Sequence, residues 1–133
     1  MLDEARVPIA AAVDLVTARQ EGRSLAARLG FDAVDQTLIA AAISEVSRNI
    51  VQHANRGEIV LRALNSGQRK GLCIVARDQG PGIADIAQAM QYGYSSRGGL
   101  GVGLPGAKWL MDEFDIASQV GVGTTITMKK WLA

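Results

Sequence analysis

The most regular feature of the sequence is a helical repeat of apolar residues between positions 32 and 54. Apolar side chains recur there every four residues, at Val34, Leu38, Ala42, Val46 and Ile50. This spacing is typical of a helix that buries one stripe of its surface. A second helix is predicted over residues 15–29, whose apolar positions include three leucines. The pattern therefore predicts two long helices that follow each other directly in the chain.

Residues that favour helix ends lie at the borders of both segments. Asp14 is predicted to cap the first helix, and Asp32 or Asp35 the second, because a short carboxylate accepts hydrogen bonds from the free N–H groups of a first turn. Gly30 suits the left-handed conformation that ends many helices. We therefore expect a sharp boundary between the two helices at this glycine.

Short runs rich in Ile, Val and Leu predict strands, which we place at 7–12, 58–64, 71–77, 115–120 and 124–132. Polar or glycine-containing turns at 65–70 and 121–123 predict two hairpins, which require antiparallel pairing. Further helices are expected over 85–92 and 104–114. Strands and helices do not alternate regularly, so the predicted fold class is α/β in the α+β sense. We expect a two-layer sandwich of a mixed, mostly antiparallel sheet with helices on one face.

Composition narrows the classes of function. The 133 residues suit one domain, and 14 Lys and Arg against 13 Asp and Glu give a net charge of +1. We expect no nucleic-acid partner, because a duplex binder needs a concentrated basic face. No apolar run approaches the roughly 18 residues that span a bilayer, so no membrane association is expected. With a single cysteine, the chain is predicted to be cytoplasmic.

Two polar side chains share one edge of the second helix. Glu45 and Asn49 are four residues apart and so project from the same face. A carboxylate beside an amide can bind Mg²⁺ and orient a nucleophile. Seen alone, such a pair is more often a solvated helix edge with one intrahelical hydrogen bond.

Two glycine-containing segments are candidate ligand loops. In the first, at 78–82, Asp78 ends a strand, where its carboxylate can accept a hydrogen bond from an exocyclic amine, although Asp, Gly and Pro also form ordinary turns. In the second, at 98–103, glycines lead directly into a helix start, where outward-pointing N–H groups favour phosphate. The second segment lacks the Gly-Lys-Ser/Thr of a P-loop, and a flexible surface loop is the alternative.

The order of these segments resembles the GHKL ATPase superfamily. The N box would lie at 45–49, and the glycine boxes at 78–82, 98–104 and 121–124. Within the superfamily the chain looks like the small serine/threonine switch kinases of the RsbT type, which act in the bacterial stressosome. The segments that carry this likeness are 41–45, 78–83, 98–101, 103–106 and 110–114. The resemblance implies a Bergerat-type ATP-binding fold that occupies residues 1–133 as a single domain.

The resemblance also implies roles for individual residues. Asn49 would coordinate Mg²⁺ on the ATP phosphates, and Glu45 would be the base or positioning group for the acceptor hydroxyl. Asp78 would accept a hydrogen bond from the adenine amine, and Thr124 would close the adenine end through water.

The glycines would surround the rest of the nucleotide. Gly80 and Gly82 would leave room for adenine and ribose, while Gly99, Gly101 and Gly103 would wrap the phosphates. Arg97 is either a contact of the terminal phosphate or a solvated loop residue. For Arg48 we expect a surface role, and for His53 a packed or exposed one.

The function implied is that of an ATP- and Mg²⁺-dependent serine/threonine kinase. Its substrates would be STAS-domain scaffold or antagonist proteins, and the released kinase would activate a metal-dependent serine phosphatase. One alternative is an anti-sigma factor kinase that sequesters a sigma subunit. Another is a nucleotide-gated binding module without catalysis. The short segment 92–98 favours the stressosome type, because anti-sigma kinases usually have a longer lid there.

Overall fold

The computed structural model describes residues 4–90 and 103–132. The helices are α1 (Ala12–Leu29), α2 (Ala33–His53), α3 (Ile86–Ala89) and α4 (Gly103–Leu110). The strands are β1 (Glu4–Ile9), β2 (Gly57–Ser66), β3 (Arg69–Asp78), β4 (Glu113–Gln119) and β5 (Gly123–Trp131).

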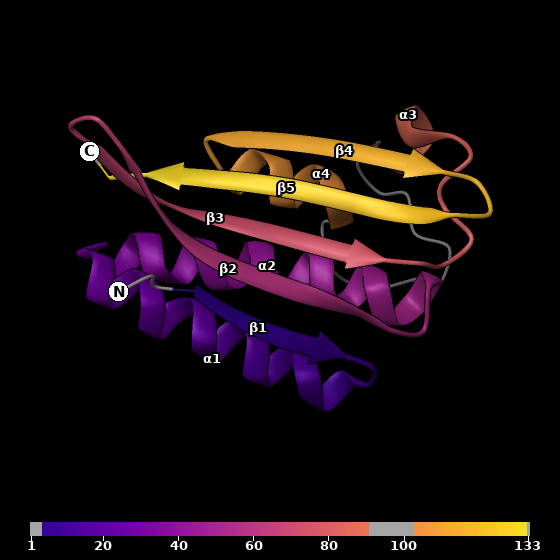
Figure 1. Cartoon of the computed structure of the whole chain (residues 1–133), viewed down its shortest axis with the longest axis horizontal. Helices are drawn as coiled ribbons and strands as arrows, with labels where there is room; N and C mark the ends of the chain where they lie inside the picture. The colour runs from indigo at the N-terminus through magenta and orange to yellow at the C-terminus, as the bar shows by residue number, and fades with distance from the viewer. Residues whose placement is uncertain (1–3, 91–102, 133) are drawn as a thin grey trace.

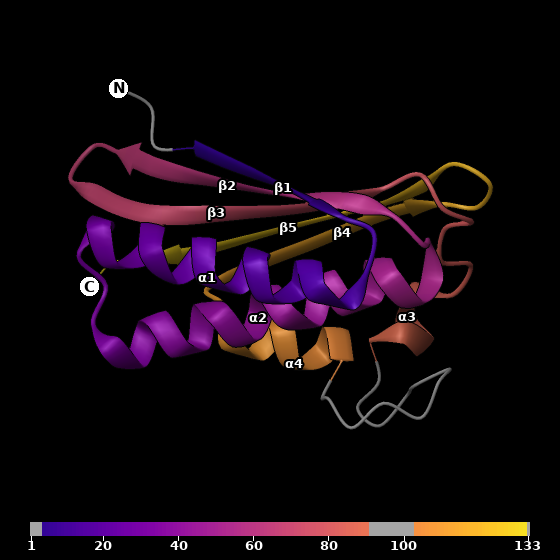
Figure 2. The same ribbon diagram turned by 90° about the horizontal axis from the view of Figure 1, so that it is seen from below.

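The strands form one sheet in the order β1-β2-β3-β5-β4 (Figure 1). All helices lie on the same side of this sheet, as the edge-on view shows (Figure 2). The predicted fold class, a two-layer sandwich with helices on one face, is confirmed. Each strand pairing is antiparallel, so the sheet is not mixed as the sequence had suggested.

The core fills the space between the sheet and the helices. One apolar row crosses all five strands through Val7, Ile59, Ala76, Ile126 and Ile116, which are register partners in turn. Helix α2 packs on this face with a buried stripe that includes Ile39, Ile43, Val46 and Ile50. Burial of such a stripe against a sheet supplies most of a helix's stability.

The stripe of α2 is rotated slightly from the predicted one. Val34 is 67% exposed, while Ile39 and Ile43 are fully buried. Ala42, Val46 and Ile50 are buried as predicted.

Helix capping differs from the prediction at Asp14 and agrees at Asp32 and Gly30. Asp14 is the third residue of α1, and its carboxylate accepts hydrogen bonds from the N–H groups of Ala10 (2.8 Å) and Ala11 (3.0 Å). Asp32 precedes α2 and accepts from the N–H of Asp35 at 2.8 Å. Gly30 has φ +100° and ends α1.

Several predicted boundaries were wrong. The first strand, expected over 7–12, spans Glu4–Ile9, because charged side chains on its outer face alternate with buried Val7 and Ile9. Helix α1 begins at Ala12 rather than at residue 15. Helix α4 ends at Leu110, because Glu113 and Phe114 already belong to β4 and pair with β5.

The face of the sheet away from the helices carries linked ion pairs. Glu4 pairs with Arg62 at 3.2 Å, and Glu58 pairs with Arg6 and Arg77 at 3.5 and 3.3 Å. Cys73 lies on this face between Arg62 and Lys129, its register partners, and is buried. Burial raises the pKa of its thiol above the ordinary value. It is therefore a protonated packing residue at neutral pH.

Candidate functional site

A polar row replaces the apolar row at one end of the sheet. On the helix-facing side, Asp78 of β3 is the register partner of Thr124 of β5, which is in turn the partner of Ser118 of β4. The next row inward is Ala76, Ile126 and Ile116, all apolar. Three hydrogen-bonding side chains thus border the buried apolar core at this end of the sheet, which makes this end a candidate for binding a partly polar ligand.

The carboxylate of Asp78 is held by backbone groups. Its Oδ1 accepts the N–H of Gly80 at 2.9 Å and the N–H of Thr124 at 3.3 Å. Its Oδ2 accepts no hydrogen bond from any residue in the described parts of the chain. An ionised carboxylate only accepts, so Oδ2 is ready to receive a donor such as an exocyclic amine.

Ser118 is a member of this row that the sequence analysis missed. Its Oγ accepts the N–H of Ile83 at 2.7 Å, lies 2.8 Å from Oγ1 of Thr124, and donates to the carbonyl of Gly123 at 3.2 Å. The loop after β3 is thereby tied to the β4–β5 hairpin. Correct register across the 121–123 turn would have placed Ser118 opposite Thr124, but sequence alone does not give that register.

The loop after β3 needs glycine where it meets its neighbours. A Cβ on Gly80 would lie 2.5 Å from the Cβ of Ala54, just after α2. Gly82 has φ +79°, and a Cβ there would lie 2.4 Å from the carbonyl oxygen of Gln119. These contacts are within the chain itself, so the predicted room for adenine and ribose at the two glycines stays a prediction.

A second group of polar residues lies where α2 meets α4. Oε1 of Glu45 is 2.6 Å from a guanidinium nitrogen of Arg48, and Oε2 accepts the N–H of Gly103 at 2.9 Å. Gly103 is the first residue of α4, so the carboxylate caps this helix. The side chain of Glu45 is only 12% exposed. Arg48, expected to have a surface role, has 38% of its side chain exposed and also pairs with Glu45.

Asn49 follows one helical turn after Glu45 and is half-buried. Its amide forms no side-chain hydrogen bond with another described residue. An amide oxygen in that setting fits a Mg²⁺ ligand that shares the ion with phosphate and water. His53, one turn further on, is exposed.

Helix α2 connects the two groups. Ala54 follows its C-terminus and lies against Gly80 beside Asp78, whereas Glu45 lies nine residues earlier. At 1.5 Å per residue this separation is roughly 13 Å along the helix axis. A ligand that reaches both groups is therefore elongated. Arg97, Gly99 and Gly101, the other predicted phosphate contacts, lie outside the described residues.

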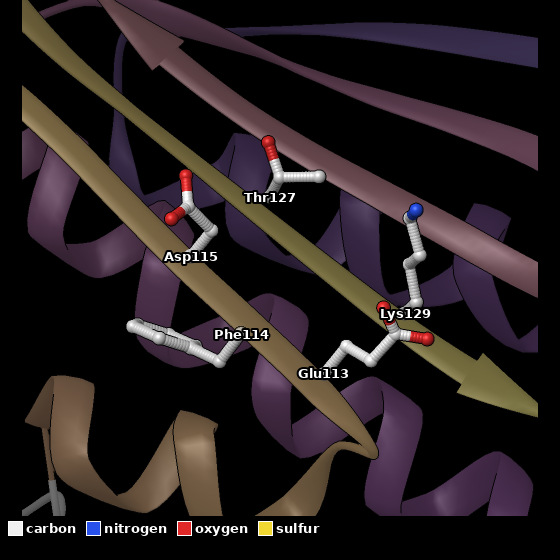
Figure 3. Close-up of a pocket in the computed structure, with 5 residues that line it drawn as sticks. All are labelled: Glu113, Phe114, Asp115, Thr127 and Lys129. Atoms are coloured by element: carbon white, nitrogen blue, oxygen red, sulfur yellow. The ribbon is translucent and has the colours of Figure 1, made fainter.

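A shallow hollow of about 250 Å³ lies elsewhere on the sheet. Figure 3 shows its lining residues on β4 and β5, which are Glu113, Phe114, Asp115, Thr127 and Lys129. Except for Phe114, these side chains alternate with the helix-facing ones, so they belong to the open face. The hollow shares no residue with the polar row.

Comparison with known proteins identifies the class. Residues 9–130 match the histidine kinase-like ATPase domain, and the chain belongs to this family. The resemblance inferred from the ordered motifs is thereby confirmed. Within residues 4–90 and 103–132, no helix is long and apolar enough to cross a membrane.

Individual relatives refine this assignment. The serine/threonine-protein kinase RsbT of Bacillus subtilis (strain 168) is 51% identical over 132 residues, which cover 99% of each chain. The anti-sigma F factor of Thermoanaerobacter sp. (strain X514) is 33% identical over 71% of this chain and 68% of its own. The solved structure of the mycobacterial sensor histidine kinase MprB has a TM-score of 0.57 over 98% of this chain and 97% of its own, at 15% identity. That structural likeness concerns the fold alone.

Proposed function

We propose that this chain is an ATP-dependent serine/threonine protein kinase of a partner-switching pathway. The observation that supports the proposal is the separation of Asp78 and Glu45 along α2, in a chain 51% identical over nearly its full length to a serine/threonine kinase. A nucleoside triphosphate has the matching shape, with an amine-bearing base at one end and phosphates at the other.

Asp78 would bind the base through Oδ2. The two N–H groups on Oδ1 fix the carboxylate plane, so the free oxygen does not need to reorganise when it accepts the adenine amine. Thr124, buried beside it, would close the same end through water bound to its hydroxyl. Gly103 would contribute its N–H to the phosphates together with Gly99 and Gly101.

Magnesium would be held by Asn49, which supplies one oxygen while phosphates and water supply the others. When bound, the ion would neutralise charge that develops on the transferred phosphoryl group. The half-buried, unpaired amide of Asn49 supports this role within the described part of the chain.

Glu45 would act on the acceptor hydroxyl. Phosphoryl transfer needs alignment and charge neutralisation more than strong base chemistry, and one carboxylate beside one metal suffices. In the observed state both oxygens of Glu45 are engaged, by Arg48 and by the N–H of Gly103. Phosphate at the N-terminus of α4 would compete for that N–H and so leave Oε2 free for the hydroxyl.

The acceptor would be a serine or threonine of a STAS-domain scaffold or antagonist protein. A phosphate of about −2 charge on that residue, placed in the interface between the kinase and the STAS-domain protein, would weaken the complex of the two. The released kinase would then bind and activate a metal-dependent serine phosphatase, all in the cytoplasm. An anti-sigma role is the second candidate, supported by relatives about 33% identical over some 70% of the chain.

The test is transfer of labelled γ-phosphate from ATP to a purified STAS-domain partner, with Mg²⁺ and with EDTA. We expect Mg²⁺-dependent labelling that Glu45→Gln abolishes and that Glu21→Gln, at an exposed position of α1, leaves unchanged. ATP binding with no transfer to any STAS protein would instead favour a non-catalytic binding module. Co-purification with a sigma subunit rather than a phosphatase would favour the anti-sigma role.

A further inference from the structure

The hydroxyl of Ser118 lies at a junction of four chain segments. Its Oγ contacts the N–H of Ile83, the carbonyl of Gly123 and the hydroxyl of Thr124, at 2.7, 3.2 and 2.8 Å. Through Thr124 it also adjoins Asp78, whose Oδ1 accepts the N–H of Thr124. The junction therefore connects directly to the end of the site proposed for the base.

Counting protons sets the direction of each bond. A serine hydroxyl has one proton to donate and two lone pairs to accept with. The carbonyl of Gly123 can only accept, so the proton of Ser118 is used there. The N–H of Ile83 can only donate and uses one lone pair. Thr124 must therefore be the donor in its 2.8 Å contact with Ser118.

The opposite arrangement satisfies fewer groups. If Ser118 donated its proton to Thr124, it would have none left for the carbonyl of Gly123. Two acceptor oxygens would then face each other at 3.2 Å without a hydrogen bond. Thr124 is only 4% exposed, and buried polar groups are costly when left without a partner. The first arrangement, in which all three contacts are hydrogen bonds, is the lower in free energy.

We propose that Ser118 is a positioning residue that fixes the Thr124 hydroxyl as a hydrogen-bond acceptor, and so selects a base edge that donates protons. The proposal rests on the proposed nucleotide site. With its proton held by Ser118, Thr124 offers only lone pairs, as Asp78 does at Oδ2. This end of the site then favours a purine with a 6-amino group over one without it.

The experiment compares two ligands in several variants. ATP and purine riboside triphosphate, which lacks only the 6-amino group, are titrated against the full chain by calorimetry with Mg²⁺ present. For Ser118→Ala we expect the preference for ATP to fall about fivefold, the size of one net hydrogen bond. Affinity for purine riboside triphosphate should change little. Ser118→Thr, which restores a hydroxyl, should recover the preference.

Matched variants separate positioning from simple support of the fold. Ser66→Ala removes an exposed hydroxyl from the end of β2 and should leave both affinities unchanged. Thr124→Val should lose the same preference, and adding Ser118→Ala to it should cost no further selectivity. Thr124→Val alone keeps the test valid if Ser118→Ala folds poorly, because a wild-type preference for ATP in that variant would overturn the inference.

Two results overturn the inference, and they differ from each other. Equal weakening of both ligands in Ser118→Ala would show that Ser118 only supports the loop, while nucleotide binding by the wild-type chain would stand. Failure of the wild-type chain to bind either triphosphate would remove the proposed function and this inference together.

Discussion

The two ends of the proposed nucleotide site, called here the base end and the phosphate end, are formed by different kinds of secondary structure. At the base end, Asp78, Thr124 and Ser118 come from three adjacent strands, and backbone N–H groups hold Asp78 and Ser118. At the phosphate end, Glu45 and Asn49 project from one helix, and Glu45 is held by one flexible arginine and one N–H at a helix start. The base end is fixed by the sheet, whereas the phosphate end depends on how α2 and α4 meet.

This difference suits the two tasks. Recognition of a base benefits from groups that are already in place, because no ordering cost is added on binding. In the proposed transfer, the carboxylate of Glu45 would leave the N–H of Gly103 and approach the acceptor hydroxyl. A site with one rigid and one adjustable end can therefore keep its specificity while its catalytic group moves.

The largest expected effect separates chemistry from binding. Glu45→Gln keeps an oxygen for the N–H of Gly103 but removes the charge, and a well-placed base is worth on the order of 10²–10⁴ in rate. We expect kcat to fall by that factor while ATP affinity changes less than about threefold. Single-turnover transfer and calorimetry measure the two quantities. A comparable loss of affinity would show that the two ends are not independent.

The next largest effect tests the base end. Asp78→Asn can keep one oxygen toward Gly80 and Thr124, but it then turns a donor toward the adenine amine. We expect ATP affinity to fall about 10- to 100-fold, as for a lost bond to a charged group. The thermal midpoint should change little. Unaltered ATP binding would contradict the assignment of Asp78.

A smaller effect probes the rigidity of the base end. Gly123 has φ +145°, and a Cβ there would lie 2.1 Å from the carbonyl oxygen of Asp78. Gly123→Ala should lower the free energy of unfolding by about 2–3 kcal/mol and weaken ATP binding. Gly67→Ala is the control, since its φ is also positive but a Cβ would meet nothing within 4 Å. Urea unfolding measures the loss of stability in each variant. Equal losses in Gly123→Ala and Gly67→Ala would show that the close contact with Asp78 is not the cause.

The smallest effect concerns the helix that carries the phosphate end. Ser47 of α2 is fully buried, and its Oγ has no hydrogen-bond partner among the described residues. Ser47→Ala should raise the free energy of unfolding. The control is Ser44→Ala, which removes an Oγ that donates to the carbonyl of Ala40. We expect the free energy of unfolding of Ser47→Ala to exceed that of Ser44→Ala by about 1 kcal/mol. Urea unfolding measures the difference. A loss of stability in Ser47→Ala would mean that this hydroxyl does have a partner.

Local signals in the sequence predicted much of the fold. Three such signals are the four-residue spacing in α2, the cap at Asp32 and the glycine at position 30. Each depends on neighbours within about one helical turn, so each can be predicted without knowledge of the tertiary structure. The end of α4 was mispredicted because Glu113 and Phe114 fit a helix equally well. Only their pairing with β5 makes them a strand.

The site was predictable where motifs mark it and not where pairing assembles it. Asp78, Thr124 and Glu45 were singled out as candidates because their neighbours form ordered motifs, and their roles stay predictions. Ser118 was missed because its role depends on register across β4 and β5. Arg48 lies at the partly exposed surface as expected, and its pairing with Glu45 was not predicted. The roles of Arg97, Gly99 and Gly101 stay predictions.

The position of β5 between β3 and β4 has a consequence for how the chain folds. Each hairpin can close locally, but the Asp78–Thr124 contact joins residues 46 apart, and such long-range closure is slow and entropically costly. The base end thus exists only after the C-terminal hairpin has docked. A nucleotide that binds only the docked form would oppose its release by mass action, so ATP concentration would govern how often this hairpin comes away.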